Sequence, residues 1–167
     1  MGKGPAKSLK DFATGGSMKL REFFEPGSVE LELAADSKAG ILRELVELLD
    51  LDEQSRGVLY KTLKRRENLG STGIGKRIAI PHCRSLVVRK LRLAYGRKSS
   101  GLDFNSIDGE LVSHFFLIVA PPLEVSNQYL PVLGKIAQFA KDPEVPQKLS
   151  TLTRPEEFIA LLEERGV

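Results

Sequence analysis

The sequence predicts an α/β fold, in which strands and helices alternate along one chain. Three observations carry this prediction. Residues 28–34 alternate between apolar and polar side chains as a half-buried strand does, residues 41–49 place their apolar side chains on one helical face, and residues 111–121 are almost entirely apolar. Because strands that alternate with helices usually form a sheet covered by helices, we expect a layered α/β domain.

The first half of the domain is expected to contain a strand over residues 28–34 followed by two helices. Ser37 is a suitable N-cap for the first helix. The second helix begins at about Asp52 and ends at Gly70, a residue type that often terminates helices. The side chains that should face inward from this second helix are Val58, Leu59 and Leu63.

The second half is expected to contain three strands and then three helices. Residues 77–80 and 90–96 are predicted strands, residues 99–101 a turn, and residues 111–121 a central strand buried on both faces. The helices that follow are predicted over residues 126–140, with Pro131 in the first turn, over residues 143–149, and from Thr153 to about Glu164, with Glu156 completing a capping box.

The composition is typical of a globular protein. The chain has 167 residues, of which 41% are hydrophobic and 28% are charged, enough for one domain with a sizeable core. Its longest purely apolar run, residues 115–120, is far shorter than the roughly 20 residues of a membrane-spanning helix, and no signal peptide is visible. A single cysteine, Cys83, excludes an internal disulfide, so we expect a cytoplasmic protein without membrane insertion.

Residues 1–17 are rich in Gly, Lys and Ser and lack an apolar pattern. We interpret them as a flexible extension, either native or added for expression, and residues 18–167 as the domain. The net charge is +3, and residues 1–17 contribute +2 of it, because they hold three lysines and one aspartate. The small remaining charge gives no indication of nucleic-acid binding.

A glycine-rich stretch, GSTGIGK at residues 70–76, fits the G-x-x-x-x-G-K pattern of a nucleotide-binding P-loop. That loop needs a strand before it, a helix after it, and a Ser or Thr next to its lysine. Here a predicted helix precedes the glycines, a predicted strand follows them, and Arg77 stands in place of the hydroxyl residue. The stretch is therefore better explained by glycines that form a turn before the strand.

His82 comes directly after that strand. Pro81 cannot donate a backbone hydrogen bond to a sheet, so we expect it to end the strand and leave His82 at the C-terminal end. Ligand sites of open α/β sheets gather at this end. Position alone leaves two interpretations open: a functional histidine, or a surface histidine without a role.

Three stretches of the sequence resemble one protein family. LGSTGIGKRIAIPH, at residues 69–82, is similar to the signature L-G-S-T-G-I-G-x-G-I-A-I-P-H of the phosphotransferase-system (PTS) enzyme IIA proteins of the fructose, mannitol and nitrogen-regulatory class, and departs from it at Arg77. Arg66–Glu67 matches the family's Arg-Glu pair, and residues 102–122 resemble its F-D-A-I-D turn and the strand that follows. The resemblance runs from about Lys19 to the C-terminus and is closest to the free-standing nitrogen-regulatory type.

The resemblance implies a mixed sheet of about five strands between helices. It also implies that His82 accepts a phosphoryl group from HPr, or from the nitrogen-branch equivalent of HPr, and passes it to a IIB domain or signals by its phosphorylation state. Such a protein carries a phosphoryl group rather than turning over a substrate, and the transfer needs no metal or cofactor. A neutral imidazole is a good nucleophile near neutral pH, which suits His82 to this role.

The resemblance places Arg66 with the phosphoryl group, because a guanidinium can bind phosphate oxygens in a bidentate way. The alternative for Arg66 is a helix C-terminal charge that meets solvent or Glu67. Weaker candidates for phosphate or partner contacts are the hydroxyls and backbone of Ser71, Thr72 and Gly73, but the hydroxyls could equally serve the loop's own backbone.

Arg77 is a further candidate, together with Lys76 and Arg84. These three residues could add positive charge near a phosphate, or they could restrict the docking of a partner. Tyr129 stands where the family often has a second histidine. A phenol can donate to a phosphate oxygen but carries no charge at neutral pH, and Tyr129 could equally be a packing residue.

Two residues are expected to lie outside the chemistry. His114 falls within the predicted buried strand, where a hydrogen-bonded core histidine is the expected state. Cys83 is not expected to bind zinc, because too few further ligands lie near it in the sequence. The remaining interpretation is a partly exposed thiol.

Two other functions are compatible with the sequence. One is a regulatory binding module that docks on a kinase, transporter or transcription factor and in which phosphorylation is vestigial. The Tyr at position 129 and the Arg at position 77 motivate this alternative. The other is the IIA component of a sugar-uptake PTS.

Overall fold

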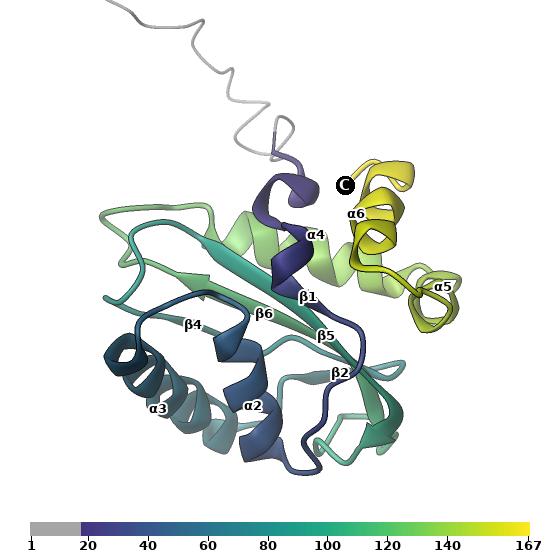
Figure 1. The fold of residues 1–167 in the computed structure, drawn as a ribbon, viewed down its shortest axis with the longest axis horizontal. Helices are drawn as coiled ribbons and strands as arrows, with labels where there is room; N and C mark the ends of the chain where they lie inside the picture. The colour runs from purple at the N-terminus through teal and green to yellow at the C-terminus, as the bar shows by residue number, and fades with distance from the viewer. Residues whose placement is uncertain (1–17) are drawn as a thin grey trace, which may run out of the picture.

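The computed structural model describes residues 18–167 as three layers, with one mixed sheet between two groups of helices (Figure 1). The strands are β1 (Val29–Glu30), β2 (Gly73–Gly75), β3 (Ile78–Ala79), β4 (His82–Arg84), β5 (Arg92–Leu102) and β6 (Val112–Ala120). The helices are the short 3₁₀ helices η1 (Leu20–Phe23) and η2 (Pro26–Ser28), and the α-helices α2 (Lys38–Glu47), α3 (Glu53–Leu69), α4 (Tyr129–Lys141), α5 (Val145–Ser150) and α6 (Pro155–Glu164). The predicted α/β class and the placing of the sheet between helices are confirmed; the proposed extension, residues 1–17, lies outside the described residues.

The sheet is built around β6. Its order is β1-β5-β6-β3-β2, and β4 also pairs with β6, which gives six strands where about five were expected. β5 runs antiparallel to β6, whereas β3 and β4 run parallel to β6 one after the other. All nine residues of β6 are buried, as its apolar sequence predicts for a central strand.

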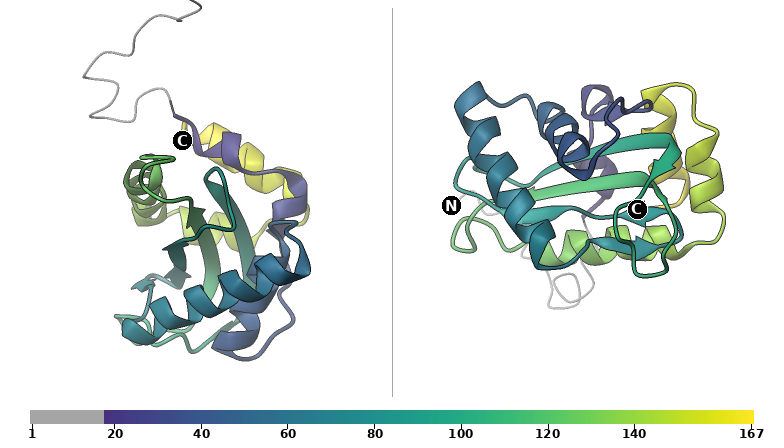
Figure 2. Two further views of the ribbon diagram at one scale, coloured as in Figure 1. Left: turned by 90° about the vertical axis from the view of Figure 1, so that its left-hand side faces the viewer. Right: turned by 90° about the horizontal axis from the view of Figure 1, so that it is seen from below.

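Each face of the sheet forms its own hydrophobic core. Phe116 and Ile118 of β6 pack on the side of η1, α4, α5 and α6, whereas Phe115 and Leu117 pack on the side of α2 and α3. Figure 2 shows these two helical layers from two further directions. Successive side chains of a strand point to opposite faces, so β6 buries apolar side chains in both cores. Burial stabilises the fold by about 25 cal/mol per Å² of apolar surface, and this holds the strand between the two helical layers.

The predicted helix ends are largely confirmed. The Ser37 side chain accepts a hydrogen bond from the backbone N–H of Gly40, the Asp52 side chain caps α3, and α3 ends at Gly70. Two boundaries differ. Helix α4 begins at Tyr129, still with Pro131 in its first turn, and the carboxylate that caps α6 belongs to Glu157, which accepts from the backbone N–H groups of residues 153 and 154.

Three other local predictions are wrong. The strand predicted over residues 28–34 stops at Glu30. The Leu33 N–H still donates to the Arg97 carbonyl of β5, but the N–H groups of Ala34 and Ala35 donate to the Glu44 side chain instead. The predicted turn at residues 99–101 lies inside β5, whose pairing with β6 is irregular between Arg97 and Leu102. Val58 is 47% exposed rather than inward-facing.

Between residues 18 and 167, none of the helices combines the length and the apolar composition that crossing a membrane requires.

Candidate active site

His82 is the first residue of β4 and lies opposite Ile118 of β6. The prediction that Pro81 would end the strand and leave His82 at its C-terminal end is therefore wrong in detail. The Pro81 carbonyl accepts a hydrogen bond from the Ile118 backbone N–H, so the chain continues beside β6 after a local interruption. A proline removes only its own donor, and its carbonyl can still join a sheet.

The imidazole of His82 is fixed by the backbone carbonyl of Ile80, two residues earlier. Its Nδ1 atom lies 2.6 Å from the carbonyl oxygen of Ile80, and because a carbonyl can only accept, Nδ1 carries the proton. The lone pair is therefore on Nε2. Partial burial lowers the pKa of His82 below 6.5, and the charge of Arg66 lowers it further, against the raising effects of the Ile80 carbonyl and of Glu67. The imidazole is thus mainly neutral at neutral pH, with Nε2 as a nucleophile.

Arg66 lies in the last turn of α3 and acts on His82 through its charge. One of its guanidinium nitrogens donates to the Gly70 carbonyl at 2.9 Å, just past the end of the helix. This contact orients the side chain while an arginine retains further N–H donors. The structure thus brings Arg66 and His82 together, as the resemblance implies.

Residues 71–73 are held tightly by the protein itself. The Ser71 hydroxyl donates to the Phe104 carbonyl at 2.5 Å, and both the N–H and the hydroxyl of Thr72 donate to the buried Glu67 carboxylate at 2.7 Å. Gly73 passes so close to Ser106 that an added Cβ would lie 2.9 Å from it. These contacts favour the interpretation in which the hydroxyls satisfy the loop rather than an anion.

Arg77 forms part of a tight turn between β2 and β3. Lys76 and Arg77 have φ values of 57° and 67°, the left-handed conformations that a two-residue type I′ hairpin requires. The guanidinium of Arg77 donates to the Ser113 hydroxyl, and its charge adds to the effect of burial in lowering the pKa of His114. The structure therefore places the Arg77 side chain against β6, and its charge is not among those that shift the pKa of His82.

Tyr129 is the other side chain that the fold brings to His82. The two ring centroids are 5.9 Å apart, and the guanidinium carbon of Arg84 lies 4.7 Å from the Tyr129 ring centroid. Burial raises the pKa of Tyr129 to about 12, so its phenol is protonated at neutral pH. Tyr129 thus occupies the neighbourhood that the resemblance assigns to a second histidine.

The two residues expected outside the chemistry behave differently. His114 is 1% exposed and hydrogen-bonds to the Tyr95 hydroxyl at 2.8 Å, as expected for a core histidine. The prediction of a partly exposed Cys83 thiol is wrong, because Cys83 is 7% exposed and burial raises its pKa to about 12. The side chain points into the core because neighbouring residues of a strand face opposite sides and His82 faces outward.

Sequence reasoning missed two groups that shape the site. The Ile80 carbonyl fixes the tautomer of His82, but a backbone atom leaves no signal in the residue types. Glu67 was recognised only as part of the Arg-Glu pair; the contact of its carboxylate with Thr72 was missed, and a charged residue on the buried face of α3 was the signal that could have shown it. Among residues 18–167, no three His, Cys, Asp or Glu side chains gather in a way that could hold a metal ion.

Known proteins are similar to this chain in sequence and in fold. The family model "Phosphoenolpyruvate-dependent sugar phosphotransferase system, EIIA 2" matches residues 22–165. A nitrogen regulatory protein of Bradyrhizobium diazoefficiens is 30% identical over 133 residues, which cover 79% of this chain and 86% of that protein. The PTS system fructose-specific EIIABC component of Bacillus subtilis is 28% identical over 134 residues, 79% of this chain, but the match spans only 21% of that longer protein.

A solved structure agrees with these relatives. The crystal structure of the nitrogen regulatory protein IIA-Ntr from Neisseria meningitidis superposes with a TM-score of 0.77 at 30% identity, covering 86% of this chain and 98% of that chain. The family match over residues 22–165 includes the sheet that carries His82, the helix that carries Arg66 and the helix that begins at Tyr129. This chain therefore belongs to the EIIA 2 family of the phosphoenolpyruvate-dependent sugar phosphotransferase system.

Proposed function

We propose that the protein is a phosphoryl carrier in which Nε2 of His82 accepts the phosphoryl group. The observation that carries the proposal is the 2.6 Å contact between Nδ1 of His82 and the Ile80 carbonyl, which leaves the Nε2 lone pair free. The family and the nitrogen regulatory relatives support a phosphocarrier or regulatory role.

The transfer balances without a metal ion. Nε2 attacks the phosphorus of a phosphohistidine on the donor protein, the N–P bond of the donor breaks, and the donor imidazole leaves with the bonding electron pair. Positive charge develops on the His82 ring during the transfer. The hydrogen bond from Nδ1–H to the Ile80 carbonyl becomes stronger as this charge grows and stabilises it. Arg66 offers a guanidinium to the phosphoryl oxygens, which stabilises their charge through positioning and electrostatics.

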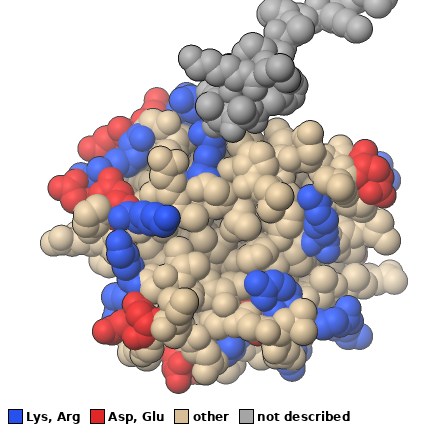
Figure 3. Space-filling model, turned by 180° about the vertical axis from the view of Figure 1, so that it is seen from behind, with Lys and Arg blue, Asp and Glu red and all other residues tan. Residues whose placement is uncertain are grey.

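Exposed apolar side chains near the site support a protein donor. Leu69, Leu86 and Leu130 are 83%, 86% and 71% exposed, and along the sequence each lies within two positions of Gly70, Arg84 or Tyr129. Exposed apolar side chains of this size suit contact with another protein. On the face drawn in Figure 3, the Lys and Arg side chains are scattered, and those at the left edge lie beside Asp and Glu side chains, a pattern that suits a protein partner better than a continuous polyanion.

We infer that the donor is an HPr-like phosphocarrier and that the phosphoryl group, once on His82, serves mainly as a regulatory signal. The nitrogen regulatory relatives support this use, whereas the fructose-specific relative supports transfer to a IIB domain as the second candidate. The proposed location is the cytoplasm, where a lone cysteine such as Cys83 stays reduced.

The test uses the two histidines of the chain as a matched pair. With phosphoenolpyruvate, enzyme I and an HPr-like carrier, we expect the protein to gain one acid-labile, base-stable phosphoryl group, detected by mass spectrometry. The variant His82→Ala should lose the label completely, whereas His114→Leu should keep it. Labelling of His82→Ala, or failure of the wild type to gain the group, would contradict the proposal.

A further inference from the structure

Arg84 lies on the same face of β4 as His82, two residues further on. The residue between them, Cys83, packs into the core beneath α2 and α3, so the side chains of His82 and Arg84 point to the opposite side of the sheet. That side carries α4 and the segment that leads into it, residues 121–128. The strand therefore presents an imidazole and a guanidinium together to the start of α4.

The guanidinium of Arg84 holds this segment at several points. One nitrogen donates to the Pro121 carbonyl at 2.7 Å and lies 3.5 Å from the Ser126 carbonyl. The same planar group lies over the ring of Tyr129, with 4.7 Å between the guanidinium carbon and the ring centroid. A guanidinium can combine in-plane hydrogen bonds with stacking on an aromatic face, and a lysine ammonium has no such plane.

Tyr129 is thereby placed beside the Arg84 guanidinium and next to the proposed acceptor. Its ring lies 5.9 Å from the His82 ring, at an angle of 56°. The charges of Arg84 and Arg66 both favour the phenolate, yet burial dominates and keeps the pKa of Tyr129 at about 12. The phenol therefore remains an O–H donor, and Arg66 acts on Tyr129 as well as on His82.

We propose that Arg84 is a positioning residue that holds Tyr129 in place, so that the phenol donates a hydrogen bond to the phosphoryl group on His82. The proposal rests on the proposed function, because it needs the phosphoryl group on that histidine. In this arrangement Tyr129 is a neutral hydrogen-bond donor, and the fixed positive charge beside the phenol is that of Arg84. A neutral donor of this kind works equally well across the neutral pH range, where a second histidine would titrate.

The experiment compares the wild type with Arg84→Gln, Tyr129→Phe and the double variant. The phosphotransfer rate at saturating donor is measured with the HPr-like carrier, together with KM for that carrier. We expect each single variant to slow transfer by about tenfold, the effect of one hydrogen bond at a reacting centre, with KM little changed. The double variant should be no slower than Tyr129→Phe, because Arg84 acts through the hydroxyl that this variant already lacks.

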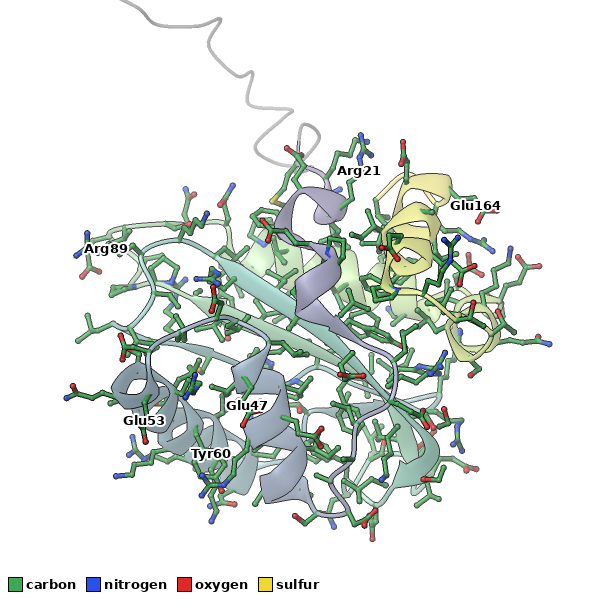
Figure 4. The ribbon with its side chains drawn as sticks, in the orientation of Figure 1. Arg21, Glu47, Glu53, Tyr60, Arg89 and Glu164 are labelled. Carbon is green, nitrogen blue, oxygen red and sulfur yellow. The ribbon has the colours of Figure 1, made fainter. Side chains whose placement is uncertain are left out.

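The matched control is Arg89→Gln, which removes the same charge from the same part of the chain. Arg89 is exposed, and Figure 4 shows it at the edge of the molecule, pointing away. This control should transfer at the wild-type rate. Circular dichroism on all variants separates loss of folding from loss of positioning, and Tyr129→Phe, which keeps the packed ring, tests the hydroxyl even where Arg84→Gln fails to fold.

Three outcomes would overturn the inference while leaving the proposed function intact: a wild-type rate in Tyr129→Phe, a wild-type rate in a folded Arg84→Gln, or losses that multiply in the double variant. The last outcome would mean that Arg84 contacts the phosphoryl group independently of Tyr129. A wild-type protein that takes up no phosphoryl group would instead overturn the proposed function itself.

Discussion

At the scale of single residues, Arg77 has a backbone conformation that its residue type disfavours. The family signature has a glycine at this position, and the backbone here has a φ of 67°, a left-handed conformation that glycine adopts without steric cost. The arginine is retained by contacts on both sides: its carbonyl accepts from the N–H groups of Ser113 and His114, and its guanidinium donates to the Ser113 hydroxyl.

This conflict makes a prediction about two small substitutions at Arg77. Both Arg77→Ala and Arg77→Gly lose the guanidinium contact, but only glycine relieves the left-handed conformation. We expect the free energy of unfolding of Arg77→Gly to exceed that of Arg77→Ala by about 1 kcal/mol. Urea denaturation measures both values, and an alanine variant as stable as the glycine variant would show that the turn carries no such strain.

At the scale of elements, the end of α3 and the strand β3 are joined through one loop. Glu67, on the buried side of α3, accepts two hydrogen bonds from Thr72, and the Thr72 carbonyl accepts from the Ile80 N–H. The carbonyl of Ile80 in turn fixes the His82 imidazole. A helix, a loop and a strand therefore share one hydrogen-bonded path to the proposed phosphoryl acceptor.

Removal of the Glu67 carboxylate should be costly, because it leaves the two buried donors of Thr72 without partners. We expect Glu67→Ala to lower the free energy of unfolding by about 2–3 kcal/mol, against less than about 0.5 kcal/mol for the exposed Glu163→Ala. The charge of Glu67 raises the pKa of His82, so the variant should also have a lower His82 pKa. Urea denaturation gives the first value and an NMR titration the second; equal stabilities of the two variants would refute the argument.

At the scale of the whole molecule, His114 connects the sheet to its helical cover. Its Nδ1 faces the Tyr95 hydroxyl of β5, and its Nε2 lies 3.4 Å from the Ser150 hydroxyl of α5. Ser150 donates to the Pro146 carbonyl, so its oxygen accepts from Nε2–H and Tyr95 donates to Nδ1. This network satisfies both nitrogens of the neutral imidazole, and burial together with the nearby charges of Arg77 and Arg97 opposes its protonation.

The stability of the molecule should therefore depend on pH through His114. Burial lowers its pKa from 6.5 to about 4, so the unfolded chain binds the proton more tightly than the folded protein. The resulting stability is complete above about pH 6.5 and is lost as the pH falls to about 4, by roughly 2–3 kcal/mol. Urea denaturation of the wild type and of His114→Leu should give curves of stability against pH that diverge over this interval; parallel curves would contradict the prediction.

Much of the fold could be predicted because its signals are local. The caps at Ser37 and Asp52, the helix end at Gly70 and the continuous apolar run of β6 each depend on a few neighbouring residues. The failures arose where distant groups override the local pattern. The predicted strand ends early where the N–H groups of Ala34 and Ala35 donate to Glu44, and residues 99–101 continue β5 through the stretch between Arg97 and Leu102 where its register with β6 shifts.

The sequence by itself determined the family, the histidine to examine and the arginine that accompanies it. Arg66 and the signature at residues 69–82 lie in one short stretch of the chain, so the residue types alone are enough to recognise them. The folded structure decided which imidazole nitrogen is free, that the Arg77 guanidinium contacts Ser113 of β6, and how Arg84 comes to lie over Tyr129. The last of these follows from the parallel register of β4 on β6, which brings Tyr129, far along the chain, beside the histidine. Register is set by the packing of whole strands between two cores, and no short stretch of sequence encodes it.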